Sequence, residues 1–190
     1  IKEGESFSLF NDGGEWQARI KEIKKGIVNF AIVKKLKHEE NNNEIWLAFS
    51  PIKLNYLNFM IQKATELGVT KFIPILTERT IVRNLNLERL SKIIIEASEQ
   101  SNRIKLPKLE KLIKLDEFMK LYKDTDIIFG DLNSKNNEIK IKKDNPLCVL
   151  IGPEGDFSEK ERKEILNLKN TKSIKINKNI LRSELSLIHI

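Results

Sequence analysis

The sequence predicts an α/β protein in which a parallel sheet is covered by helices on both faces and is preceded by part of a small antiparallel barrel. Short strand-like segments separated by turn residues fill residues 5–36. From about residue 45 onward, strands alternate with amphipathic helices. Two of the later strands, 45–49 and 147–151, are continuously apolar, which is typical of parallel strands buried on both faces.

The first predicted domain spans residues 1–40 and is rich in strands. Its three expected strands cover residues 6–10, 16–23 and 27–33. The turn Asn11–Gly14 joins the first two, because Asn, Asp and Gly tolerate positive φ, and Gly26 marks the second turn. Three antiparallel strands in so short a stretch indicate a partial barrel. The polar segment 38–43 is the expected linker.

The second predicted domain spans residues 44–190. Its expected strands cover residues 45–49, 71–76, 125–130, 147–151 and 172–176, and its expected helices cover 54–67, 87–101, 116–122 and 158–168. Apolar residues at spacings of three and four indicate the first helix, which Gly68 ends. A capping box, Ser158 with Glu161, begins the last helix. The polar segment 133–145 is expected to be a long loop.

Composition excludes several classes of protein. The single cysteine, Cys148, rules out a disulfide framework and a zinc site built on cysteines, and we expect no metal. Because Cys148 lies within an apolar strand, we expect a core residue and not a nucleophile. No apolar run is long enough to span a membrane, and no signal-peptide pattern is present, so we expect a cytoplasmic protein.

The net charge of +7 is carried by residues 51–190, because residues 1–50 hold eight basic and eight acidic side chains. A basic domain suits a polyanionic partner, and it is equally compatible with a solvated lysine-rich surface.

Ligands of open α/β sheets bind beyond the carboxyl ends of the strands. Three segments are expected there: 76–80, 151–157 and 179–184.

The segment 151–157 carries the most specific pattern of the three. It contains Gly-Pro-Glu-Gly at 152–155, leading directly into a capped helix. Glycines at these positions allow a ligand to approach the backbone closely, and Pro153 stiffens the bend. The pattern is not a phosphate-binding loop. A tight structural turn before a helix is an equally good interpretation.

Residues 150–158, Leu-Ile-Gly-Pro-Glu-Gly-Asp-Phe-Ser, resemble the LIGPEGGFS signature of the RsmE family. Three more segments resemble the family in the same order, at 63–69, 96–101 and 180–184. The resemblance implies a PUA-like barrel followed by a SPOUT domain that contains a trefoil knot and forms a homodimer. It also implies S-adenosylmethionine as cofactor and methylation of N3 of a uridine in the 16S ribosomal RNA of the small subunit.

The resemblance assigns residues to the cofactor site. These are Ile75, Leu76, Thr77, Gly130, Ile151, Gly152, Gly155, Ile176, Ile180 and Leu181. The chain departs from the family at Asp156, where glycine is usual, at Asn177, where a glycine is expected nearby, and at Ser183, where threonine is usual.

Methyl transfer to uridine N3 requires that the N3 proton leaves and that charge on the two flanking carbonyl oxygens is stabilised. Arg182 is the candidate for stabilising this charge, because a guanidinium is permanently charged and donates two parallel hydrogen bonds. Glu154 and Glu184 are candidates for taking the proton or orienting Arg182. Expected RNA contacts, or alternatively plain surface charges, are Arg79, Arg83 and Arg103.

Two alternatives stay open. One is a related SPOUT methyltransferase that acts on another nucleotide, by methylation of a ribose or a guanine. The other is an RNA-binding assembly factor that has lost turnover.

Overall fold

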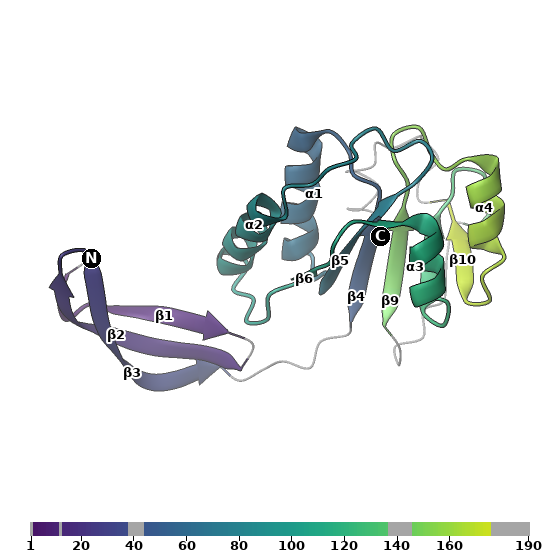
Figure 1. Cartoon of the computed structure of the whole chain (residues 1–190). Helices are drawn as coiled ribbons and strands as arrows, with labels where there is room; N and C mark the ends of the chain where they lie inside the picture. The colour runs from purple at the N-terminus through teal and green to yellow at the C-terminus, as the bar shows by residue number, and fades with distance from the viewer. Residues whose placement is uncertain (1, 12, 38–43, 137–145, 176–190) are drawn as a thin grey trace.

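A computed structural model describes residues 2–11, 13–37, 44–136 and 146–175. The first part is a three-stranded antiparallel sheet in the order β1-β2-β3, drawn at the left of Figure 1. Its strands are β1 (Ser6–Asn11), β2 (Gly14–Lys24) and β3 (Ile27–Lys37). All three strands were predicted, although β2 and β3 are longer than expected. Apolar side chains of β3 such as Ile27 and Ile32 are exposed, so the described strands form an open part of a barrel. The predicted linker 38–43 lies outside the described residues.

The second part contains the predicted parallel sheet. Its strand order is β10-β8-β9-β4-β5-β6. Strand β7, which is not part of this row, also pairs with β5. The strands are β4 (Ile45–Phe49), β5 (Lys71–Leu76), β6 (Lys108–Leu109), β7 (Ile113–Lys114), β8 (Asp126–Gly130), β9 (Leu147–Ile151) and β10 (Thr171–Ile174). Every pairing among them is parallel. The α/β class is therefore confirmed.

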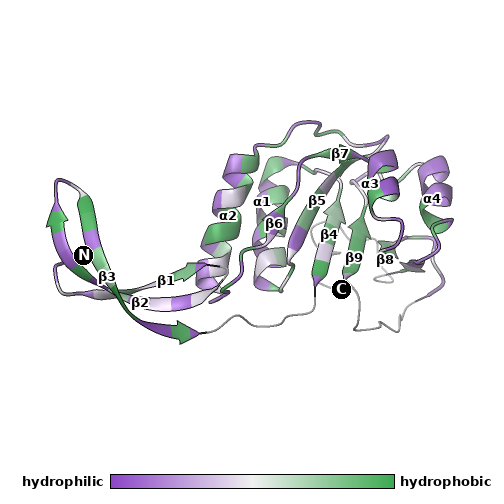
Figure 2. Cartoon of the chain, turned by 60° about the horizontal axis from the view of Figure 1, so that its bottom comes forward, coloured by the Kyte–Doolittle hydropathy of each residue, from purple (hydrophilic) through white to green (hydrophobic). Residues whose placement is uncertain are grey.

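Helices cover both faces of this sheet, with α1 and α2 on one side and α3 and α4 on the other (Figure 1). They are α1 (Leu54–Glu66), α2 (Leu87–Gln100), α3 (Leu115–Leu121) and α4 (Glu159–Leu166). Successive side chains of a strand point to opposite faces, so Leu47 and Phe49 of β4 pack against α1 and α2, whereas Ala48 faces the other core. Burial on both faces explains why β4 and β9 are apolar along their length (Figure 2).

Strands β6 and β7 were missed, because two residues are too few to show a periodic pattern. The last strand ends two residues earlier than expected. Of the predicted loop 133–145, residues 133–136 are described and contain no helix or strand. The predicted trefoil knot requires the path of residues 176–190, which lie outside the described residues.

Candidate cofactor and methyl-transfer site

The carboxyl ends of β9, β4 and β5 lie side by side, because these three strands are adjacent and parallel. Ser50, the first residue after β4, links its two neighbours. Its backbone N–H donates to the Ile151 carbonyl at 3.2 Å, and its hydroxyl donates to the Ile75 carbonyl at 3.3 Å. The backbone ends of β5 and β9 are thereby held at one edge of the sheet.

Two of the three segments expected at this edge are in direct contact. Arg79 Nη1 donates to the Gly155 carbonyl at 2.8 Å, across 76 positions of sequence. The Glu78 backbone N–H donates to Glu161 Oε1 at 2.7 Å, while Glu161 Oε2 accepts from the Ser158 N–H at 2.9 Å. One carboxylate thus caps α4 and holds the turn after β5. The third segment, 179–184, lies outside the described residues.

Three buried hydroxyl groups fill the space beneath the turn after β5. Thr77 Oγ1 and Thr80 Oγ1 are 2.8 Å apart, and each lies 3.3 Å from Ser50 Oγ. Thr80 Oγ1 also accepts from the Thr77 N–H at 2.9 Å. The side chain of Thr77 therefore points into the protein and positions the turn. No sequence spacing indicated this cluster, since its members come from two strand ends.

Gly152 is required by a neighbouring aromatic ring. A Cβ at this position would lie 2.7 and 2.9 Å from two ring carbons of Phe157, well inside contact distance. The Phe157 ring is buried and packs edge-on against Phe129, with centroids 5.3 Å apart. The sequence interpretation attributed this glycine to close approach of a ligand. The structure adds a second reason, packing against Phe157, and close approach of a ligand stays a prediction.

We expect Gly152→Ala to reduce the free energy of unfolding by about 1–2 kcal/mol, because the new methyl group forces the Phe157 ring from its site. Gly155→Ala is the matched control. Its Cβ would lie 3.7 Å from Arg79 carbons, an ordinary contact, so its effect should stay within about 0.5 kcal/mol. Urea unfolding of both variants measures the difference, and equal stabilities would contradict the packing argument.

Asp156 occupies the one left-handed conformation in this turn, with φ of 58°. Asp tolerates this region because its short side chain bonds to the local backbone. Asp156 Oδ1 accepts from the Phe157 N–H at 2.8 Å, and the Asp156 N–H donates to the Pro153 carbonyl at 2.9 Å. The turn therefore keeps its shape where the resembled family has glycine.

The end of β8 is tied to α4 by an ion pair that sequence reasoning missed. Asp131 directly follows Gly130 and is 2% exposed. Arg162 contacts it with two bonds, Nε to Oδ1 at 3.0 Å and Nη2 to Oδ2 at 2.8 Å. The hydrogen bond to Asp131 raises the pKa of Arg162 above its ordinary value. This pair positions the backbone beside Gly130, an expected cofactor contact.

The three arginines proposed for RNA binding have different environments. Arg83 is exposed, whereas Arg79 is engaged with Gly155 as described above. Arg103 is half-buried, and its Nη1 donates to the carbonyls of Thr65 and Val69 at 2.6 and 2.7 Å. Burial lowers the pKa of Arg103. Arg103 therefore holds the end of α1, and RNA contact remains a prediction for all three arginines.

The remaining predicted residues divide into two groups. Glu154 is described and exposed, at the tip of the turn. The others lie outside the described residues: Ile176, Ile180, Leu181, Arg182 and Glu184. In the described ranges, no group of three or more His, Cys, Asp or Glu side chains could hold a metal ion. No described helix is long and apolar enough to cross a membrane.

Cys148 is fully buried in β9, as predicted, and burial raises its pKa to about 12. The raised pKa contributes stability that is fully present below the ordinary pKa of a thiol and is lost as the pH rises above that value toward about 12. We expect a chromogenic disulfide reagent at pH 8 to label no thiol in the folded protein and one equivalent in urea. Full labelling of the folded protein would contradict this assignment.

The chain thus combines an antiparallel sheet with a parallel α/β sheet that has two linked turns at its carboxyl edge. A family model described as an RNA methyltransferase domain matches residues 39–188, and one described as an RNA methyltransferase PUA domain matches residues 1–33. The chain belongs to the RsmE family, the ribosomal RNA small subunit methyltransferases E.

Among its relatives is the ribosomal RNA small subunit methyltransferase E of Rickettsia conorii. It is 34% identical over 99% of this chain and 79% of its own length. The Neisseria gonorrhoeae enzyme of the same name, solved bound to S-adenosyl methionine, matches with a TM-score of 0.87 and 27% identity over 99% of this chain and 81% of its own. A Legionella pneumophila methyltransferase solved with the same cofactor matches with a TM-score of 0.86 and 28% identity. The match covers 100% of this chain and 81% of the Legionella chain.

Proposed function

We propose that this protein transfers the methyl group of S-adenosylmethionine to N3 of a uridine in 16S ribosomal RNA. The observation that carries the proposal is the contact of the turn after β5 with the turn after β9, made by Arg79 with Gly155, and with α4, made by Glu78 with Glu161. This contact forms one rim at the carboxyl edge of the sheet, where α/β proteins bind their ligands. A relative of the same family and a similar methyltransferase were solved with the cofactor bound.

The described part of this rim fits a nucleoside cofactor. Leu76, Gly130 and Gly152 are half-exposed ends of neighbouring segments, while Ile75 and Ile151 are buried directly behind them. Such an edge offers backbone groups and an apolar floor to an adenine ring, as small-molecule sites commonly do. The chain's own contribution here is to hold these backbone segments in register, through Ser50, Glu161 and the Asp131–Arg162 pair.

S-adenosylmethionine supplies an electrophilic methyl group on a sulfonium. The protein must place uridine N3 in line with it and promote loss of the N3 proton. Arg182 is proposed to stabilise the negative charge on the two carbonyl oxygens beside N3, in the manner of an oxyanion hole. Glu154 or Glu184 is proposed to accept the proton. The exposed position of Glu154 at the rim is compatible with contact to a bound substrate.

We further propose that the substrate is recognised within the small ribosomal subunit and that the protein acts as a homodimer in the cytoplasm. Family membership and the sequence resemblance support these proposals. Methylation of another nucleotide, and RNA binding without turnover, are the alternatives to be separated by experiment.

The test combines product analysis with cofactor titration. Small subunits or 16S RNA lacking the modification are incubated with the protein and S-adenosylmethionine, and digested nucleosides are identified by mass spectrometry. The expected product is N3-methyluridine. A methylated ribose or guanine would overturn the assigned position. Absence of any product together with absence of binding heat in calorimetry would favour the assembly factor instead.

A further inference from the structure

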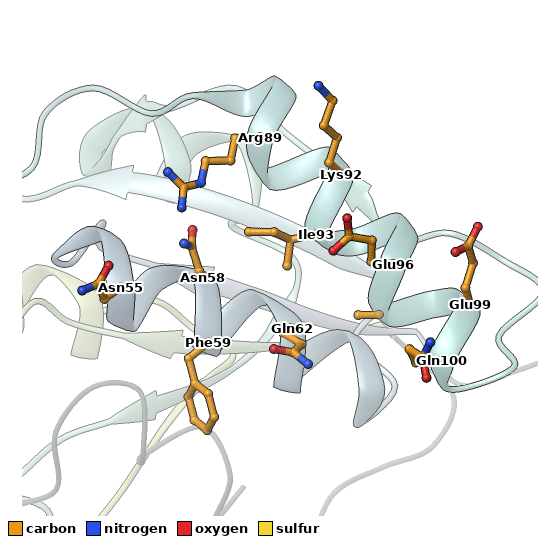
Figure 3. Close-up of a pocket in the computed structure, with 11 residues that line it drawn as sticks. Asn55, Asn58, Phe59, Gln62, Arg89, Lys92, Ile93, Glu96, Glu99 and Gln100 are labelled. Atoms are coloured by element: carbon orange, nitrogen blue, oxygen red, sulfur yellow. The ribbon is translucent and has the colours of Figure 1, made fainter.

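A groove between α1 and α2 lies outside the site described above. Its volume is about 790 Å³, and Figure 3 shows the side chains that line it. Asn55, Asn58 and Gln62 line it from α1, at spacings of three and four residues that place them on one helix face. Gln100 adds a fourth primary amide from α2. Uncharged amides carry both donors and acceptors, so they suit a ligand with mixed hydrogen-bonding edges rather than a simple ion.

One of these amides carries an unmet hydrogen-bonding group. Asn58 Oδ1 is buried and has no hydrogen-bond partner among the described residues. A buried acceptor without a donor is unfavourable, so a ligand N–H would remove that penalty once the Asn58 amide turns toward the groove. Ser98 Oγ, on α2, is likewise buried without a partner in the described part of the chain. Ser98 lines a second, smaller hollow of about 200 Å³.

The groove also offers a ring surface and charges of both signs, with Lys92 paired to Glu88 at 2.8 Å. Phe59 lines the groove and is 41% exposed, so its ring is accessible to a stacking partner. Arg89 and Lys92 lie in the first half of α2, and Figure 3 shows the Arg89 guanidinium extending above the Asn58 amide. Stacking on an aromatic ring, amide contacts to base edges and a nearby cation for phosphate are the elements of single-stranded nucleic-acid recognition.

The position of the groove connects the two parts of the protein. Asn55 and Arg89 lie at the amino ends of their helices, which follow strands β4 and β5 and therefore begin at the carboxyl edge of the sheet. At the opposite end, Glu99 lines both the groove and the second hollow, which also includes Ser8 and Phe10 of β1. The groove therefore lies between helices that begin at the edge of the candidate site, and its other end adjoins the hollow beside the N-terminal sheet.

We propose that the α1–α2 groove binds unpaired nucleotides of the ribosomal RNA that flank the target uridine, reading base edges with its amides and stacking a base on Phe59. The inference rests on the proposed function, because it takes RNA as the substrate. Acidic Glu96 and Glu99 accept hydrogen bonds from exocyclic amino groups, whereas the phosphates face Arg89.

The test measures the affinity of the full chain for a fluorescein-labelled single-stranded RNA of mixed sequence and for the same sequence as a duplex. Phe59→Ala and the double variant Asn55→Leu/Gln62→Leu alter side chains that are exposed, so folding should be preserved. We expect each to weaken single-strand binding about ten-fold and to leave duplex binding unchanged. Arg89→Gln should lower the slope of affinity against salt by roughly one.

Two matched controls lie on the opposite face of the sheet. Leu121→Ala removes an exposed apolar side chain on α3, and Asn167→Leu replaces an exposed amide after α4. Both should leave RNA affinity unchanged. Unchanged single-strand affinity in the groove variants would overturn the inference. A shift in oligomeric state by light scattering, with RNA affinity intact, would assign the groove to a second copy instead and would also overturn it.

Failure of the proposed function is distinguishable from failure of this inference. A protein that forms no N3-methyluridine, yet loses RNA affinity in the groove variants, refutes the assigned reaction and supports the groove. A protein that forms the product with full affinity in all groove variants supports the reaction and refutes the groove.

Discussion

Replacing Arg182 by alanine is expected to reduce methyl transfer by about 10²–10³-fold while S-adenosylmethionine still binds. The residue stands in the segment 180–184 that resembles the RsmE family. Arg182 is proposed to stabilise the negative charge that accumulates on the flanking uracil oxygens. This charge is present only while N3 loses its proton. Loss of the guanidinium should therefore lower kcat and leave the KM for the cofactor nearly unchanged. Single-turnover methylation and calorimetric titration measure the two effects.

Arg182→Lys provides the graded comparison. Lysine keeps the positive charge but lacks the planar fork that donates two parallel bonds, so an intermediate rate is expected. Arg19→Ala, at an exposed position of β2, controls for the loss of one surface charge and should retain full turnover. Near-normal turnover of Arg182→Ala would remove Arg182 from the mechanism.

Replacing Arg162 by leucine is expected to reduce the free energy of unfolding by about 2 kcal/mol, because the nearly buried Asp131 carboxylate loses its charged partner. The effect should be smaller than for a fully buried pair, since the Arg162 side chain is 24% exposed. The KM for S-adenosylmethionine should also rise, because Asp131 directly follows Gly130 and Asp131 Oδ1 accepts from the Asn133 N–H. Urea unfolding at pH 7 gives the first quantity and steady-state kinetics the second.

The double variant Asp131→Asn/Arg162→Leu separates pairing from packing. It removes the unpaired charge, so its stability should recover to within about 1 kcal/mol of the wild type. Lys169→Leu, an exposed cation on the turn after α4, should leave stability unchanged within about 0.5 kcal/mol. If the double variant were as unstable as Arg162→Leu alone, the ion pair would not be the cause.

Much of the fold could be predicted because its signals are local. Strands β4, β5 and β9 have the bounds expected from their apolar runs, and helices α1 and α2 end within a residue of the expected position. The capping box that begins α4 is present in full. Each of these signals depends on residues a few positions apart, and local backbone preference and burial agree there.

The candidate site was predicted only in part. The turn at 151–157 was recognised by its motif, but the packing of Phe157 against Gly152 was not, because it depends on how the turn folds back. Arg103 was expected to contact RNA or to be a plain surface charge, and the sequence did not indicate that its guanidinium donates to the backbone carbonyls of Thr65 and Val69. An arginine in a lysine-rich chain indicates a specific task for its planar fork, and the sequence does not tell which acceptor that fork meets.

The sequence alone determined the types and succession of helices and strands, the division into two parts and membership of the RsmE family. These properties depend on local periodicity and on contiguous motifs. Which polar groups meet was decided by tertiary structure. Asp131 and Arg162 are 31 positions apart, and Glu78 and Glu161 are 83 apart. Such pairs form only once β8, β9, β4 and β5 take their places in the sheet, and strand order is a long-range property that no local pattern contains.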